Sequence, residues 1–215
     1  MELRSDDPPL SGIILAGGQS TRMGRDKALL DIGGKPLLSR IAGQMLTAGI
    51  HPVAVAVGEG QKEEQYRSIL CDREGRVDFV RDIYPGCGPL AGLHAALSAL
   101  PAGYAFVMAC DMPVLSGSLL RRMAEAAFRL PAADPSAPDV FRTPEQPFHA
   151  IYHTRIAAQL RLRLEEGDYS VMRMLDTLNN HLVQPTPEEE EAFVNLNSPE
   201  MYESYIERTS RGDVD

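Results

Sequence analysis

Apolar positions along the chain form short uninterrupted runs separated by longer stretches of mixed polarity. Uninterrupted apolar runs are typical of strands that are buried on both faces of a parallel sheet. Such runs lie at residues 10–15, 53–57, 77–80, 104–110 and 148–152. The stretches between and after them predict helices at residues 36–49, 61–70, 90–100, 116–130, 154–166, 170–178 and 199–207. This alternation predicts an α/β fold of three layers, in which a mostly parallel central sheet lies between helices.

A proline-rich stretch from residue 131 to residue 147 interrupts the alternation. It contains five prolines and few apolar residues, so we expect a loop or hairpin insertion there. No internal repeat and no linker divides the chain, and 215 residues suit one domain. We therefore predict a single domain over residues 1–215, with fraying after about residue 207.

Charge and cysteine content narrow the class of protein. The net charge is −9, but residues 186–215 alone contain nine acidic residues and two arginines, which argues against a nucleic-acid-binding role. The three cysteines form no CxxC pair, which argues against a disulfide framework or a structural zinc site and favours a reducing compartment. No secretory signal and no apolar run of 18 residues is present. We expect a cytoplasmic protein that binds neither nucleic acid nor a membrane.

The segment after the first predicted strand carries the strongest chemical signal. Gly17 and Gly18 allow the backbone amides to approach a bulky anion such as a phosphate. Arg22 and Lys27 add cationic groups within a few residues. The fingerprints GxxxxGK(S/T) and GxGxxG are absent. The segment predicts a phosphate-binding turn, and the alternative is a glycine-rich turn followed by a solvated basic patch.

Two carboxylates end predicted strands, where ligands bind in open α/β sheets. Asp111 follows the strand at 104–110, and its oxygen atoms suit Mg²⁺, which prefers one or two carboxylates together with substrate phosphates. A turn cap before Pro113 is the structural alternative for Asp111. Asp82 ends another strand before a glycine-containing helix start, which a tight loop explains equally well.

Other reactive residue types do not predict a site of their own. Cys110 is interpreted as a small buried residue rather than a nucleophile, because the sequence places no base beside it. His94 lies in an apolar helix and is expected to be packed or to act as a cap. His149 and His153 have no companions at metal-ligand spacing.

The motifs together resemble the molybdenum cofactor guanylyltransferase family. The resemblance covers residues 11–205 and follows the family's order of blocks. These blocks are Leu15-Ala16-Gly17-Gly18, Arg22-Met23-Gly24, Asp26-Lys27-Ala28-Leu29, Gly33 with Lys35-Pro36-Leu37, Gly88-Pro89-Leu90-Ala91-Gly92, Cys110-Asp111-Met112-Pro113 and Phe193-Val194-Asn195-Leu196-Asn197-Ser198-Pro199-Glu200.

The resemblance implies a Rossmann-like nucleotidyltransferase that transfers GMP from GTP to Mo-molybdopterin and releases pyrophosphate. It implies a nucleotide-binding half at about residues 10–115 and a pterin-binding half at about residues 116–207. It also implies that Mg²⁺ is the cofactor, and that molybdoenzyme chaperones or other cofactor-biosynthesis proteins are partners.

The motifs and the resemblance together assign roles to individual positions. Nucleotide binding is assigned to Leu15, Ala16, Gly17, Gly18, Lys27, Asp82 and Asp111. Catalysis is assigned to Arg22, Lys27 and Asp111, Mg²⁺ binding to Asp111, and the pterin side of the cleft to Asn195 and Asn197.

Four positions depart from the family's pattern. Ala56 and Gly58 stand where some members have asparagines that contact the nucleotide. Tyr169 and Ser170 stand where some members have arginines in a late helix. The departures concern recognition of the base and the completeness of the pterin site.

Three other functions are compatible with parts of this pattern. A cytidylyltransferase acts on the same cofactor with CTP, but its first motif resembles Leu-Ala-Ala-Gly, unlike residues 15–18 of this chain. A sugar-phosphate nucleotidyltransferase often has a longer second half, for which 215 residues leave little room. A non-catalytic nucleotide-binding module would not require both Lys27 and Asp111.

Overall fold

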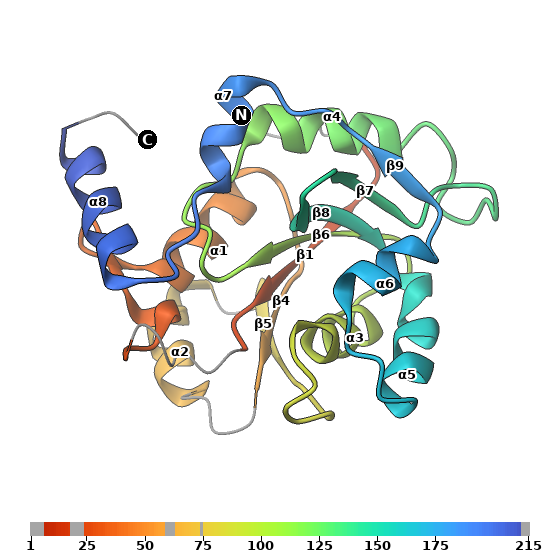
Figure 1. Cartoon of the computed structure of the whole chain (residues 1–215), viewed down its shortest axis with the longest axis horizontal. Helices are drawn as coiled ribbons and strands as arrows, with labels where there is room; N and C mark the ends of the chain where they lie inside the picture. Colours follow the sequence, from red (N-terminus) through yellow and green to blue (C-terminus); the bar gives the residue numbers. More distant parts are fainter. Residues whose placement is uncertain (1–6, 18–23, 59–62, 74, 212–215) are drawn as a thin grey trace.

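A seven-stranded sheet forms the centre of the computed structural model, which describes residues 7–17, 24–58, 63–73 and 75–211 (Figure 1). In spatial order its strands are β5 (Val77–Arg81), β4 (Val53–Val57), β1 (Leu10–Leu15), β6 (Tyr104–Ala109), β8 (Gln146–His153), β7 (Val140–Thr143) and β9 (Asn180–Leu182). Strand β8 runs antiparallel to β6 and β7, and all other neighbouring pairs are parallel. The predicted mostly parallel sheet is confirmed.

Helices cover both faces of this sheet. They are α1 (Leu37–Thr47), α2 (Glu63–Ile69), α3 (Pro89–Ala99), α4 (Gly117–Ala127), α5 (Ala157–Glu165), α6 (Val171–Asp176), α7 (Pro187–Glu190) and α8 (Pro199–Ser210). Helices α3, α5 and α6 pack on one face, and α1, α2, α4 and α8 contribute to the core on the other (Figure 1). Successive strand residues alternate between the two cores, as Ile13 and Ile14 of β1 do. Two-sided burial therefore explains why the central strands are apolar at most positions, whereas β5 at the edge of the sheet carries the exposed Asp78 and Arg81.

The proline-rich stretch forms the hairpin that was one of its two predicted forms, with β7 and the start of β8 inside it. Two small features were not predicted. Strand β9 is a short, largely exposed edge strand, so it has no apolar pattern. Strands β2 (Asp31–Ile32) and β3 (Lys35–Pro36) flank Gly33 and Gly34, whose positive φ angles of 63° and 81° form the two-residue turn.

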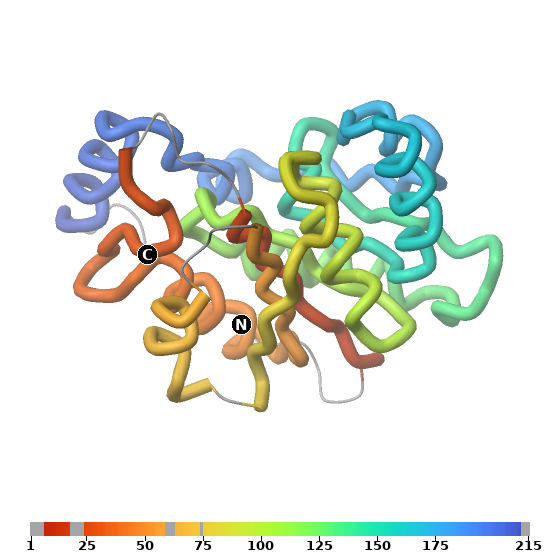
Figure 2. The backbone as a smooth tube through the Cα atoms, turned by 90° about the horizontal axis from the view of Figure 1, so that it is seen from below, coloured from red at the N-terminus to blue at the C-terminus, as the bar shows by residue number. Residues whose placement is uncertain are grey.

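The C-terminal helix lies beside a segment from the beginning of the chain. Figures 1 and 2 both show α8 next to the residues that follow Gly24. The Tyr202 hydroxyl donates a hydrogen bond to the Asp31 carbonyl at 2.7 Å. The helix continues to Ser210, so the expectation of fraying after about residue 207 was wrong by one turn. No helix within the described ranges is both long and apolar enough to span a membrane.

Candidate active site

The carboxyl ends of the neighbouring central strands β1 and β6 lie together at one end of the sheet. Leu15 and Ala109 are register partners, and the Cys110 N–H donates to the Leu15 carbonyl at 3.0 Å. Ala16 and Gly17, which follow β1 directly, are therefore fixed next to Asp111. A cavity of about 280 Å³ opens at these carboxyl ends. It is lined by Leu15, Ala16, Gly17, Asp26, Lys27, Ala28, Pro89, Ala109, Cys110, Asp111 and Phe148.

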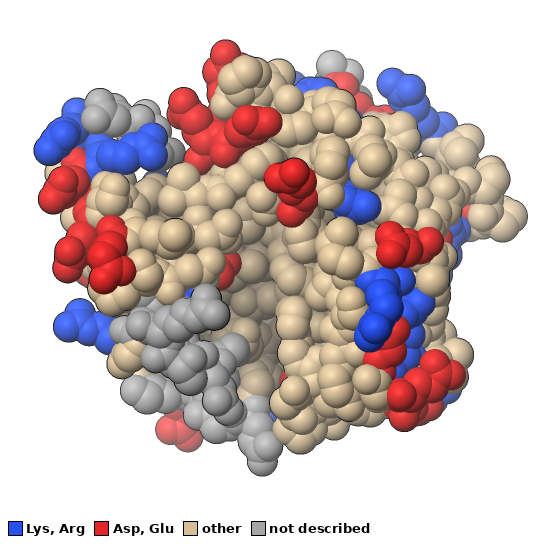
Figure 3. All heavy atoms as spheres, viewed as in Figure 1, with Lys and Arg blue, Asp and Glu red and all other residues tan. Residues whose placement is uncertain are grey.

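The face of the molecule seen in Figure 3 is hollowed near its centre. On the part of its rim that the structure describes, the hollow is bordered mostly by uncharged residues, whereas acidic side chains gather over α7 and α8. The acidic residues of the C-terminal region thus lie away from the hollow, and a polyanionic ligand can approach it without crossing them.

Lys27 connects three distant parts of the chain. Its Nζ atom donates to Asp111 Oδ2 at 3.1 Å and to Asn197 Oδ1 at 2.5 Å. The Leu196 N–H donates to the Asp111 carbonyl at 2.8 Å, which fastens the segment that carries Asn197 to the end of β6. The Lys27 and Asp111 side chains are only 23% and 21% exposed, so water weakens this contact less than at an open surface. The structure thus brings together three of the residues assigned from the sequence.

Ala16 and Gly17 also lie close to the end of β4. The Ala16 N–H donates to the Ala56 carbonyl at 3.0 Å, and a Cβ atom on Gly17 would lie 3.6 Å from the Gly58 backbone nitrogen. The buried Ala56 side chain belongs to the core that α3 covers, next to Gly92. Ala56 therefore offers the site a backbone carbonyl and no polar side chain.

Other assigned residues lie apart from this contact. Asp82 follows β5 and does not line the cavity within the described residues; its Oδ1 atom accepts the Tyr84 N–H at 2.7 Å. Burial raises the pKa of Asp82, and the hydrogen bond from Tyr84 opposes that shift. Asn195 donates to the Phe193 carbonyl at 3.1 Å, and the described residues show no hydrogen bond between Asn195 and Lys27. Gly18 and Arg22 lie outside the described residues.

Residues not singled out from the sequence also line the cavity. Asp26 and Ala28 flank Lys27 in one of the recognised blocks, which could have indicated them. Pro89 begins α3, and Phe148 comes from β8, whose position beside β6 no local pattern reveals. Cys110 is buried as expected, and burial raises the pKa of its thiol, so it stays protonated and is a poor nucleophile.

Comparison with known proteins decides the family. Residues 12–183 match the MobA-like NTP transferase domain. The chain belongs to this family. It is 33% identical over 207 residues to a probable molybdenum cofactor guanylyltransferase of Natronomonas pharaonis, covering 93% of this chain and 98% of that protein. It is 32% identical over 201 residues to the molybdenum cofactor guanylyltransferase of Photobacterium profundum, covering 91% and 94%.

A solved structure gives the same result for the fold of this MobA-like NTP transferase. It is molybdopterin-guanine dinucleotide biosynthesis protein A from Archaeoglobus fulgidus, with a TM-score of 0.73 at 22% identity, covering 94% of this chain and 100% of that one. The family resemblance and the nucleotidyltransferase fold predicted from the sequence are both confirmed.

The donor set of this MobA-like NTP transferase suits a divalent cation only together with substrate. No group of three or more His, Cys, Asp or Glu side chains in the described residues could hold a metal. Two carboxylates line the cavity, those of Asp26 and Asp111, and Asp111 is the one that is paired with Lys27. Mg²⁺ usually binds proteins through one or two carboxylates and completes its shell with water and substrate phosphates. Asp111 therefore fits Mg²⁺ and does not fit a metal that needs a full protein cage.

Proposed function

We propose that this chain is a molybdenum cofactor guanylyltransferase, which transfers GMP from GTP to Mo-molybdopterin and releases pyrophosphate. The names of its relatives support the activity and both substrates. The observation that carries the proposal to this chain is the Lys27 contact with Asp111 and Asn197 at the cavity beside the carboxyl ends of β1 and β6. It joins a cation, a carboxylate and an amide, which are the groups needed to position two phosphorylated substrates.

The two halves suggested by the resemblance meet at this contact. Lys27 and Asp111 belong to the half at residues 10–115, which we propose to bind GTP. Asn197 belongs to the half at residues 116–207, which we propose to bind the pterin. Asn195 lies two residues earlier in the same segment, and we keep it as a second pterin-side residue. We treat both halves as one domain.

Lys27 has a donor left for a substrate. A lysine ammonium group has three N–H donors. Two of them bond Asp111 and Asn197, and no other acceptor within the described residues takes the third. We assign that donor to a phosphate oxygen of GTP, and the backbone amide of Gly17 to the same phosphate chain. The Ala16 N–H already donates to the Ala56 carbonyl, so Ala16 contributes by fixing the backbone that carries Gly17. Gly18 and Arg22 remain predictions for the same role.

The reaction requires positioning and charge compensation rather than a covalent enzyme intermediate. A terminal phosphate oxygen of Mo-molybdopterin attacks the α-phosphorus of GTP, and the bond from that phosphorus to the pyrophosphate oxygen breaks. A phosphate monoester is already largely ionised near neutral pH, so no general base is needed. Lys27 offsets the negative charge that both substrates bring together.

Asp111 is the residue that would hold Mg²⁺ in this proposal. When bound, Mg²⁺ would supply charge neutralisation at the phosphate oxygens. Asp111 accepts a hydrogen bond from Lys27, so the carboxylate and the ammonium group orient each other before substrates arrive. Transfer of the product to a molybdoenzyme chaperone, and a location in the cytoplasm, stay predictions.

Calorimetric titration with GTP, CTP and ATP, each with and without Mg²⁺, tests the choice of nucleotide. We expect the tightest binding for GTP, with a clear dependence on Mg²⁺. The CTP-dependent alternative has no support from the relatives, which are named as guanylyltransferases. Tighter binding of CTP would nevertheless overturn the proposal, and so would the absence of binding to all three.

A further inference from the structure

Asp26 places a negative charge in the wall of a cavity proposed to bind a triphosphate. It lines the cavity next to Lys27, with which it could form an ion pair. Among the described residues no such ion pair is present, because Lys27 is paired with Asp111. The hydrogen-bond partners of the Asp26 carboxylate therefore matter, because they decide whether it turns toward Lys27.

Both oxygen atoms of Asp26 accept hydrogen bonds from uncharged donors. Oδ1 accepts the Ala28 N–H at 3.1 Å, which caps the short 3-10 helix Lys27–Leu29. Oδ2 accepts the Tyr66 hydroxyl at 2.6 Å. The first bond is local, whereas the second comes from a residue 40 positions later in the chain.

Tyr66 is built to donate this hydrogen bond permanently. It lies on α2, its side chain is fully buried, and its ring belongs to the core that also contains Cys110 and Met112. Burial, and then the neighbouring Asp26 carboxylate, raise the pKa of Tyr66, so its hydroxyl keeps its proton at neutral pH. A buried ring fixes the position of the hydroxyl better than an exposed one, because fewer rotamers are open to it.

We infer that Tyr66 is a positioning residue of the nucleotide site. Its hydroxyl holds the Asp26 carboxylate away from Lys27, which leaves the ammonium group to Asp111, Asn197 and a phosphate of GTP. This inference rests on the proposed function. Without the hydroxyl, Asp26 Oδ2 loses its donor. Of the two cationic residues that flank Asp26 in the sequence, Arg25 and Lys27, only Lys27 lines the same cavity and can replace that donor there. Such an ion pair would compete with GTP for the ammonium group.

The test compares the GTP dissociation constants of the full-length wild type and Tyr66→Phe by calorimetry. Phenylalanine keeps the buried ring and removes only the hydroxyl. We expect binding about 3- to 10-fold weaker, the size expected when a hydrogen bond that orients a charged group is lost. Tyr104→Phe is the matched control. It removes the hydroxyl of another buried tyrosine, which lies at the opposite end of the sheet from the cavity. That hydroxyl donates to the Pro138 carbonyl at 3.0 Å.

A second variant separates positioning from packing. In an Asp26→Asn background no carboxylate competes for Lys27, so adding Tyr66→Phe should change GTP affinity less than twofold. An equal loss in both backgrounds would overturn the inference, and so would wild-type affinity in Tyr66→Phe alone. Melting temperatures of all variants show that folded proteins are being compared. A wild type that binds no GTP would overturn the proposed function and the inference together, whereas a normal Tyr66→Phe would overturn the inference alone.

Discussion

At the scale of single residues, Lys27 is the side chain on which we propose that nucleotide binding depends most. We expect Lys27→Met to weaken GTP binding by about 10- to 100-fold, because one charge-assisted hydrogen bond contributes about 1.5–3 kcal/mol. Calorimetry of the folded variant measures the loss. Lys35→Met is the control, since Lys35 is an exposed lysine on β3 and does not line the cavity. Equal effects of the two substitutions would remove Lys27 from the site.

His149 makes stability depend on pH. It is fully buried between the rings of Phe106 and Phe193, and neither ring nitrogen has a hydrogen-bond partner within the described residues. Burial lowers the pKa of His149 from 6.5 to about 4. As the pH falls from about 6.5 to about 4, the unfolded chain therefore takes up a proton that the native protein does not. Stability falls through that window and is fully present above it.

The loss attributable to His149 between pH 7.5 and pH 5 is roughly 2 kcal/mol. Denaturant unfolding at the two pH values measures it. We expect His149→Leu to reduce the pH dependence by that amount. His181→Leu, which replaces an exposed histidine on β9, should leave it in place. An unchanged pH dependence in His149→Leu would show that another group titrates in this window.

At the scale of elements, sequence patterns predicted the strands and strand ends that depend on interactions between residues close together in the chain. The apolar runs of β1, β4, β5 and β6 predicted those strands, and the Gly17 turn and Asp111 were predicted to lie where the strands end. Phe148, Tyr66 and the contact between Lys27 and Asn197 depend on which distant segments become neighbours. The position of β8 and the route of the C-terminal segment determine these contacts, and neither leaves a pattern in the nearby sequence.

Two glycines of the first strand and its turn illustrate separate roles of one residue type. A Cβ atom on Gly12 would lie 2.9 Å from a side-chain carbon of Ile50 and 3.0 Å from the Met45 sulfur. Both distances are too short, so an alanine at this position would overpack the core. We expect Gly12→Ala to cost about 1–3 kcal/mol of unfolding free energy. Gly17→Ala meets only the Gly58 backbone, at 3.6 Å, so it should keep stability within about 0.5 kcal/mol while weakening GTP binding. Denaturant unfolding and calorimetry distinguish the two, and a stability loss at Gly17 would contradict this assignment.

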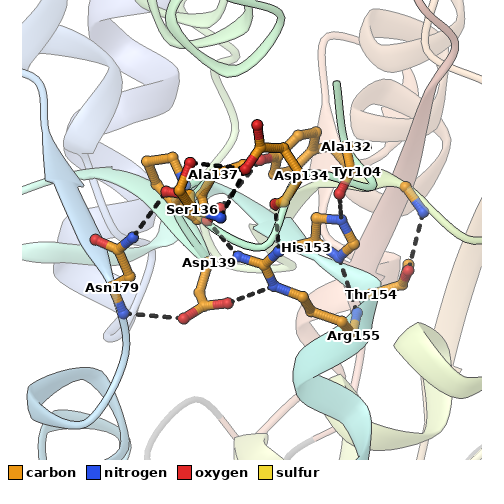
Figure 4. Close-up of polar contacts among 12 residues, drawn as sticks. Tyr104, Ala132, Asp134, Ser136, Ala137, Asp139, His153, Thr154, Arg155 and Asn179 are labelled. Atoms are coloured by element: carbon orange, nitrogen blue, oxygen red, sulfur yellow. Dashed lines mark hydrogen bonds and ion pairs between the residues drawn. The ribbon is translucent and has the colours of Figure 1, made fainter. Parts of the chain in front are cut away.

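A hydrogen-bond network centred on Arg155 lies at the end of the sheet opposite the cavity (Figure 4). Its guanidinium group donates to Asp139 Oδ1 at 2.7 Å and to the carbonyls of Asp134 and Ala137. His153 adds a hydrogen bond to the Ala132 carbonyl at 2.7 Å, and burial lowers the pKa of His153. The network attaches the loop at residues 131–139 to the end of β8.

Arg155→Lys should lower the unfolding free energy by about 1–3 kcal/mol, because an ammonium group cannot reproduce the planar set of donors. GTP affinity should not change, since the network lies away from the cavity. Arg161→Lys, an exposed substitution on α5, is the control for stability. A lower GTP affinity of Arg155→Lys would contradict this expectation, because it would show that the Arg155 network influences the cavity at the other end of the sheet.

At the scale of the whole molecule, the C-terminal segment contributes to the candidate site at the carboxyl ends of β1 and β6. Leu196 bonds the end of β6, Asn197 bonds Lys27, and Tyr202 bonds the Asp31 carbonyl. The acidic residues that dominate the net charge lie on α7 and α8, outside the hollow (Figure 3). The net charge of the sequence therefore gave little information about the site, and the cationic and glycine motifs gave more.

Guanylyl transfer at this cavity is tested most directly by one competition assay. The purified protein is incubated with Mo-molybdopterin, Mg²⁺ and equal concentrations of GTP and CTP, and the pterin products are identified by mass spectrometry. We expect the guanine dinucleotide with an equal amount of pyrophosphate. We also expect turnover at least about 100-fold lower in Asp111→Asn, and unchanged in Asp78→Asn, an exposed position on β5. A cytosine dinucleotide, no product, or a normal rate in Asp111→Asn would contradict the assignment.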